Sequence, residues 1–151
     1  MMRGSLDATT VFDAHRAAEA GHLKEWVIGF LERNGQEPDL VRALRQPVPR
    51  MISGPHYVPL DEFERVVGPE PGMAFPEDKA TFELRVLAAQ SKIRRGKMPA
   101  PILVGRGRGR RAILCDGNHT LEALRREGFS DYWSIEWRAW GDYRPKHWLD
   151  R

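Results

Sequence analysis

The sequence predicts an α/β fold of the α+β kind, a small mixed sheet with helices that follows a helical N-terminal segment. Two apolar runs, 101–104 and 112–115, are separated by a stretch rich in glycine and arginine, which is typical of a β-hairpin. Helical periodicity over 119–127 begins directly after the second run, and a Trp/Ile strand pattern follows over 132–137. We therefore expect strand, helix and strand over 112–137 to form a βαβ unit with a right-handed crossover.

Size and composition favour one compact domain. The chain has 151 residues, and its 24 Lys and Arg against 21 Asp and Glu give a net charge of +3, too small to diagnose nucleic-acid binding. No apolar run approaches the roughly 18 residues of a membrane helix, and the N-terminus lacks the apolar stretch of a signal peptide. A single cysteine, Cys115, excludes an internal disulfide. These features predict a cytoplasmic protein with no membrane partner, and they leave its oligomeric state open.

Residues 1–50 are predicted to form a helical N-terminal extension. Its central helix carries an apolar stripe at i, i+3, i+4, i+7 and i+8 spacing and ends at Asn34-Gly35; the stripe consists of Leu23, Trp26, Val27, Phe30 and Leu31. One helix is expected before it, up to Gly21, and a short one after it over 38–45. The α/β domain then takes residues 51–138, and residues 139–151 are expected to pack back on it as a tail.

The segment that leads to the hairpin is expected to be mostly irregular. Glycine and proline predict a loop between Met51 and Tyr57, followed by a short strand over 57–60 and a helical turn over 61–67. After a loop over 68–73, Pro76-Glu77-Asp78 begins the next helix, because proline suits a first turn and acids suit the positive end of the helix dipole. Its buried face is expected to consist of Phe82, Val86, Leu87 and Ala89.

The segment Asp116-Gly117-Asn118-His119-Thr120 carries the strongest functional signal. Where a strand ends in a glycine turn and a helix begins at once, the first backbone N–H groups of the helix lack partners and make an anion site. His119 and Thr120 can add donors to phosphate oxygens, and Asp116 can bind Mg²⁺ or orient His119. The same spacing also fits plain helix capping by Asp116 or Asn118, with His119 an ordinary first-turn residue.

These residues carry a family resemblance. The run Asp116 to Leu124, followed by Gly128, resembles the "DGNHR-x-x-A…G" signature of ParB/sulfiredoxin-like domains. Pro101 to Val104 resembles their "PPI-V" strand, and Val58 to Phe63 resembles their opening element. The three motifs cover about half of the chain in the family order. The resemblance implies a small fold that binds nucleotide phosphates, used by different members for sulfinic-acid reduction, NTP-dependent DNA clamping, free-serine phosphorylation, ATP hydrolysis and DNA cleavage.

Departures from the family pattern reduce the number of these activities that we expect of this chain. Asn118 stands where sulfiredoxins have the catalytic Cys before the motif His, so sulfinic-acid reduction is not expected. The segment after Gly128 is too short for the helix-turn-helix reader of the partitioning proteins, so a chromosome-partitioning clamp is not expected either. Thr120 replaces the usual motif Arg, which removes a bidentate phosphate contact.

The first functional hypothesis is a nucleotide-binding NTPase or phosphotransferase. Gly117, Asn118, His119 and Thr120 would bind the phosphates of ATP, ADP or CTP, with Mg²⁺ as the cofactor on Asp116. The catalytic residues would be His119, Asp116 and Glu70. Glu70 is the first choice of base because the family's kinase members carry an acid in the loop after the opening strand, and Glu62 and Asp61 are the next candidates.

The second hypothesis is a ParB-like nuclease or nucleic-acid-binding module. The same loop would hold a backbone phosphate of DNA or RNA, and the basic hairpin over 105–111 would contact the strand or a second phosphate through Arg106, Arg108, Arg110 and Arg111. A solvated hairpin tip explains these arginines equally well. A third possibility is a degenerate member of the fold that binds a protein partner through its helical extension.

Overall fold

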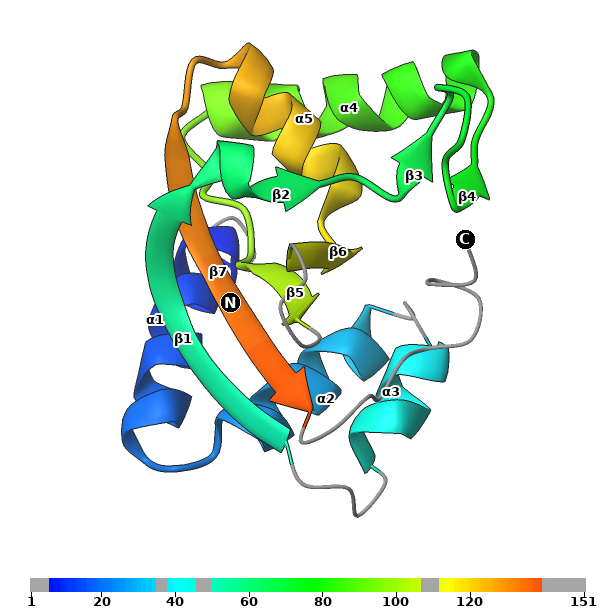
Figure 1. Cartoon of the computed structure of the whole chain (residues 1–151). Helices are drawn as coiled ribbons and strands as arrows, with labels where there is room; N and C mark the ends of the chain where they lie inside the picture. Colours follow the sequence, from blue (N-terminus) through cyan, green and yellow to red (C-terminus); the bar gives the residue numbers. More distant parts are fainter. Residues whose placement is uncertain (1–5, 35–37, 46–49, 107–111, 140–151) are drawn as a thin grey trace.

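The computed structural model describes residues 6–34, 38–45, 50–106 and 112–139. Three helices come first: α1 (Leu6–Glu19), α2 (Leu23–Arg33) and α3 (Pro38–Arg45). The other two, α4 (Lys79–Arg94) and α5 (Asn118–Arg126), lie side by side at the top of Figure 1, away from α2 and α3. The three helices predicted before residue 50 are thus present within the described ranges.

The main sheet is mixed and has the strand order β1-β7-β5-β6-β2. Its strands are β1 (Arg50–Pro59), β2 (Phe63–Glu64), β5 (Ile102–Arg106), β6 (Ala112–Asp116) and β7 (Asp131–Ala139). β5 pairs antiparallel with β6, as the hairpin prediction requires, and parallel with β7. A separate parallel pair joins β3 (Val67–Gly68) to β4 (Phe75–Pro76). The predicted class, a small mixed sheet with helices, is therefore confirmed.

The predicted right-handed βαβ unit is wrong. β5 lies between β6 and β7, and it runs antiparallel to the first and parallel to the second. β6 and β7 consequently run in opposite directions, so α5 does not make a parallel crossover between neighbours. The apolar run of β5 explains its central place: Ile102, Leu103 and Val104 are all fully buried, as expected of a strand covered on both faces.

The loop predicted between Met51 and Tyr57 is also wrong, because β1 runs through it and pairs antiparallel with β7. The register shifts between Ser53 and His56, which takes Gly54-Pro55 out of the regular ladder. β1 is an edge strand, where proline is tolerated since one side needs no ladder hydrogen bond. The helical turn predicted over 61–67 is reduced to the short 3₁₀ turn η2 (Leu60–Glu62), and β2 follows it.

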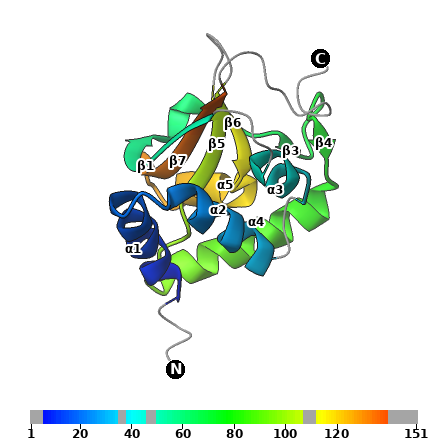
Figure 2. The same ribbon diagram turned by 90° about the horizontal axis from the view of Figure 1, so that it is seen from below.

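Helices cover both faces of the sheet. On one face, Leu103, Cys115, Ile135 and Trp137 form a single core with α1, α2 and α3. On the other face, Ile102, Val104 and Leu114 pack with Leu121 and Leu124 of α5. The N-terminal extension therefore shares its core with the sheet, and Figure 2 shows α1 and α2 lying across it.

The buried face of α4 differs from the prediction at one position. Phe82 and Val86 are buried as expected, but Leu87 is 52% exposed and Gln90 is buried in its place. Phe82, Val86 and Gln90 follow i, i+4, i+8 spacing and share one face, while Leu87 points away from it.

No helix in the described part of the chain is both long and apolar enough to cross a membrane. The predicted packing of the C-terminal tail concerns residues 140–151, outside the described ranges.

Candidate functional site

The turn between β6 and α5 exposes the start of a helix. Gly117 has φ +106°, a left-handed conformation that residues with a Cβ rarely adopt, and α5 begins at the next residue. Gly117 provides no side-chain cap, and the first intrahelical bond runs from the Leu121 N–H to the Gly117 carbonyl at 2.8 Å. The N–H groups of Asn118, His119 and Thr120 therefore have no partner within the helix.

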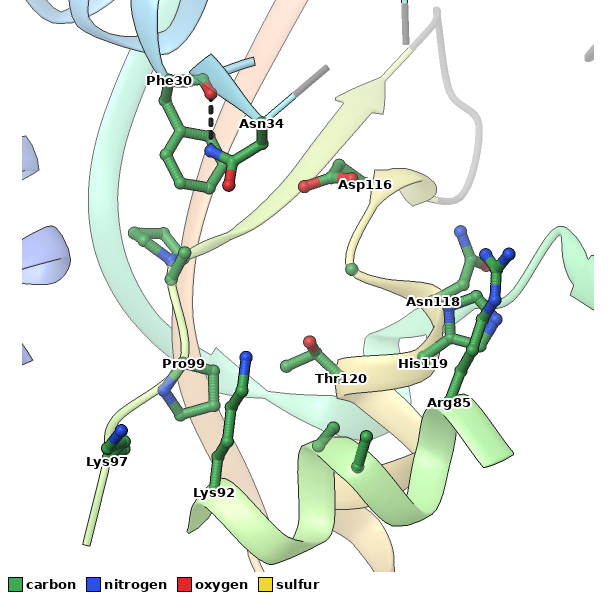
Figure 3. A pocket seen from close by; sticks show the side chains of 15 residues that line it. Phe30, Asn34, Arg85, Lys92, Lys97, Pro99, Asp116, Asn118, His119 and Thr120 are labelled. Atoms are coloured by element: carbon green, nitrogen blue, oxygen red, sulfur yellow. Dashed lines mark hydrogen bonds between the residues drawn. The ribbon is translucent and has the colours of Figure 1, made fainter. Parts of the chain in front are cut away.

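A pocket of about 390 Å³ opens at this helix start. Figure 3 shows it bounded by α2 on one side and α4 on the opposite side, with the residues before β5 and the start of α5 between them. Its lining from α5 and the preceding turn is Asp116, Gly117, Asn118, His119 and Thr120, so the structure brings all five predicted loop residues to one cavity.

The charge of the pocket is mainly positive. α4 contributes Arg85 and Lys92, two turns apart on one face, and the following segment contributes Lys97. Asp116 is the one carboxylate in the lining. Among the described residues, no carboxylate lies within ion-pair distance of Lys92, which Figure 3 shows directed into the cavity. Such a surplus of cations beside unpaired helix amides favours an anionic ligand.

Asn118 ties the helix start to a distant segment. Its side-chain oxygen accepts hydrogen bonds from the backbone N–H groups of Val66 and Val67, at 2.8 and 3.2 Å, and the residue is only 6% exposed. This oxygen thus holds the chain before β3 against α5. Because the side-chain oxygen is used in this way, Asn118 can make the predicted phosphate contact only by donating from its N–H groups.

The side chain of His119 contacts Glu77, a residue predicted from the sequence only as part of a helix start. Its Nε2 lies 2.7 Å from Oε1 of Glu77, and both side chains are largely buried, at 24% and 15% exposure. Arg85 lies 3.6 Å from the other carboxylate oxygen of Glu77. The two partners are 42 positions apart in the sequence, so local spacing carried no sign of the contact.

Glu70, the predicted base, lies elsewhere. Its carboxylate pairs with Arg65 at 2.5 Å and does not line the pocket. The hydrogen bond from Arg65 lowers the pKa of Glu70, which makes it a weaker base. The structure therefore places Glu77, and not Glu70, beside the motif histidine.

Arg106, the hairpin arginine within the described residues, is also separate from the pocket. Arg106 lies 3.1 Å from Glu136 and 3.6 Å from Glu62, at the far end of β5 from the pocket. Arg108, Arg110 and Arg111 lie outside the described residues. Because β5 and β6 are antiparallel, the start of β5 and the end of β6 meet at the pocket edge, whereas Arg106 at the end of β5 lies at the opposite edge of the sheet.

The metal prediction rests on Asp116 alone. The described residues contain no group of three or more His, Cys, Asp and Glu side chains placed to hold a metal ion. Asp116 lines the pocket as a partly exposed carboxylate. It fits a Mg²⁺ ion that takes most of its oxygen ligands from phosphates and water.

Fold and site together define a small α/β domain with a cation-lined pocket at a helix start. No protein-family model matches the sequence, and no curated protein matches it. A solved structure, the C2221 form of a Pnob8-like ParB-N domain, is similar with a TM-score of 0.35 and 14% identity, over 60% of this chain and 30% of that chain.

The role of Asn118 predicts a loss of stability. Asn118→Ala leaves two backbone N–H groups without their acceptor, and unfolding in urea should show a decrease of about 1–3 kcal/mol. Ser91→Ala, on the exposed face of α4, is the control and should stay within about 0.5 kcal/mol of the native chain. Equal stability of the two variants would contradict the assigned role.

Proposed function

We propose that the chain binds the phosphate groups of a nucleotide in the pocket at the start of α5 and hydrolyses or transfers a phosphoryl group there. One observation carries the proposal: the unpaired N–H groups of α5 open into the same cavity as Arg85, Lys92 and Lys97. The pocket volume of about 390 Å³ falls within the roughly 300–1,000 Å³ of small-molecule sites. ATP, ADP and CTP are the candidate ligands.

The cations of α4 can replace the arginine that the motif lacks. Thr120 occupies the position of the usual motif Arg and offers one hydroxyl donor. Arg85 supplies a guanidinium from a different element, and Lys92 supplies an ammonium. Charge-assisted hydrogen bonds contribute roughly 1.5–3 kcal/mol each, so a few of them outweigh the ordering of these side chains and support micromolar to millimolar binding.

Mg²⁺ is the expected companion of the phosphates. A single carboxylate, Asp116, is enough for this ion because Mg²⁺ usually keeps several waters and takes further oxygens from the nucleotide. When bound, the ion would neutralise charge that develops on the phosphates.

The Glu77–His119 pair supports chemistry as well as binding. An ionised Glu77 can only accept, so the 2.7 Å contact places a hydrogen on Nε2 of His119. The neutral imidazole then keeps its lone pair on Nδ1, which can take a proton from water or a substrate hydroxyl as that oxygen attacks the terminal phosphorus. The bond from this phosphorus to its bridging oxygen breaks, and the shortened nucleotide leaves. Glu77 is the positioning residue for His119 in this scheme.

Binding is tested by calorimetric titration of ATP, ADP, CTP and inorganic phosphate with Mg²⁺. Lys92→Ala should weaken nucleotide binding about tenfold, because it removes a charge-assisted contact of about 1.4 kcal/mol or more. Lys79→Ala removes the same charge from the same helix outside the pocket and should leave the affinity within about twofold. Saturable binding of short DNA or RNA, with none of any nucleotide, would overturn the proposal in favour of a nucleic-acid module.

Turnover is tested by release of inorganic phosphate from the nucleotide that binds. Glu77→Gln should keep nucleotide affinity within about threefold but lower kcat by about tenfold or more, since a well-placed general base contributes roughly 10²–10⁴ in rate. Glu70→Gln is the matched control and should retain the native rate, because Glu70 pairs with Arg65 outside the pocket. A large loss in Glu70→Gln with none in Glu77→Gln would reverse the two roles.

A further inference from the structure

The pocket has a second end that phosphate binding does not use. Across the cavity from Lys92 and Thr120, Figure 3 shows Phe30 and Asn34 at the end of α2. The residues before β5 continue this wall with Pro99, Ala100 and Pro101, which are apolar. We infer that this end holds the base of the nucleotide, and that Asn34 selects a base with an exocyclic amino group. The inference rests on the proposed function and names the substrate class within it.

Phe30 offers an ordered aromatic ring to the pocket. Its ring stacks on Trp26, with centroids 5.3 Å apart and planes at 11°. This contact restricts the ring, so less freedom is lost when a base packs on the pocket side. Stacking of a base on an aromatic side chain is sequence-tolerant and contributes roughly 1–3 kcal/mol. Phe30 therefore supplies affinity for any base, and the choice between bases must come from a polar group.

Asn34 is that polar group. Its side-chain Nδ2 donates a 2.7 Å hydrogen bond to the carbonyl of Phe30. A carbonyl only accepts, so this contact fixes which end of the carboxamide is nitrogen. The oxygen is left as an acceptor at the pocket, where Figure 3 shows it on the side away from the dashed bond. An acceptor there pairs with the amino groups of adenine or cytosine and not with the carbonyl oxygen at the same ring position of hypoxanthine or uracil.

The packing of α2 explains why these two residues lie at the site. Val27 and Leu31 are fully buried against the sheet face that carries Leu103 and Cys115. Phe30 and Asn34 lie on an adjacent face of the same helix, towards the start of β5 and the end of β6. The N-terminal extension thus completes a pocket whose phosphate end belongs to the α/β domain.

The experiment is a calorimetric titration of ATP, ITP, CTP, UTP and inorganic tripolyphosphate, each with Mg²⁺, into the full chain. Native protein should bind ATP more tightly than ITP, or CTP more tightly than UTP, by about fivefold, and tripolyphosphate more weakly than the preferred nucleotide. Asn34→Ala should remove the preference between the two bases. Phe30→Ala should weaken the preferred nucleotide about tenfold and leave tripolyphosphate within about twofold.

Two further variants keep the test decisive. Phe30→Leu retains an apolar side chain in case Phe30→Ala fails to fold, and it should show the same selective loss. Phe12→Ala removes a phenylalanine that is 70% exposed on α1 and should change nothing. If nucleotides and tripolyphosphate bind the native chain equally and Phe30→Leu affects neither, the base site is overturned while phosphate binding stands. If no phosphate compound binds the native chain, the proposed function itself fails.

Discussion

The site depends on one buried carboxamide. Asn118, the first residue of α5, accepts from the backbone of Val66 and Val67, and β3 at Val67 pairs with β4, which leads directly to Glu77. Glu77 returns to bind His119, the neighbour of Asn118, and its own N–H donates to the Gly68 carbonyl at 3.0 Å. These contacts close a ring around the helix start. The ring fixes both the N–H groups that face the pocket and the histidine beside them, so the position of each depends on Asn118.

Local patterns predicted most of the elements. Helical spacing found α2 and α5, and the two apolar runs found the β5–β6 hairpin, because each pattern lies within one element. Strand order was not predictable in this way: β5 separates β6 from β7, which depends on contacts between runs far apart in the chain. Gly54 and Pro55 concealed the first half of β1 because their usual role is in loops, while an edge strand accommodates them at a register shift.

The candidate site likewise combines residues that a local sequence pattern could predict with residues that it could not. The residues from Asp116 to Thr120 are consecutive, so a strand–glycine–helix pattern was enough to find them. Arg85 and Phe30 meet this loop through the packing of α4 and α2, and Glu77 meets it through the β3–β4 pair that precedes α4. Glu70 was chosen by analogy of position, and its pairing with Arg65 depends on a turn that the sequence did not specify. One local signal did point to the basic side of the pocket on α4. Arg85 and Lys92 recur on one face of this helix, and Phe82 and Val86 lie on another.

The backbone N–H groups at the start of α5 are the proposed phosphate site. The most direct measurement is an NMR titration of the ¹⁵N-labelled chain with ATP and Mg²⁺, followed by inorganic phosphate. We expect the amide signals of Asn118, His119 and Thr120 to move most and to saturate together, since new hydrogen bonds form at these N–H groups. Saturating shifts confined to the end of β5 and the start of β6, with the amide signals of α5 unmoved, would contradict phosphate binding at the start of α5.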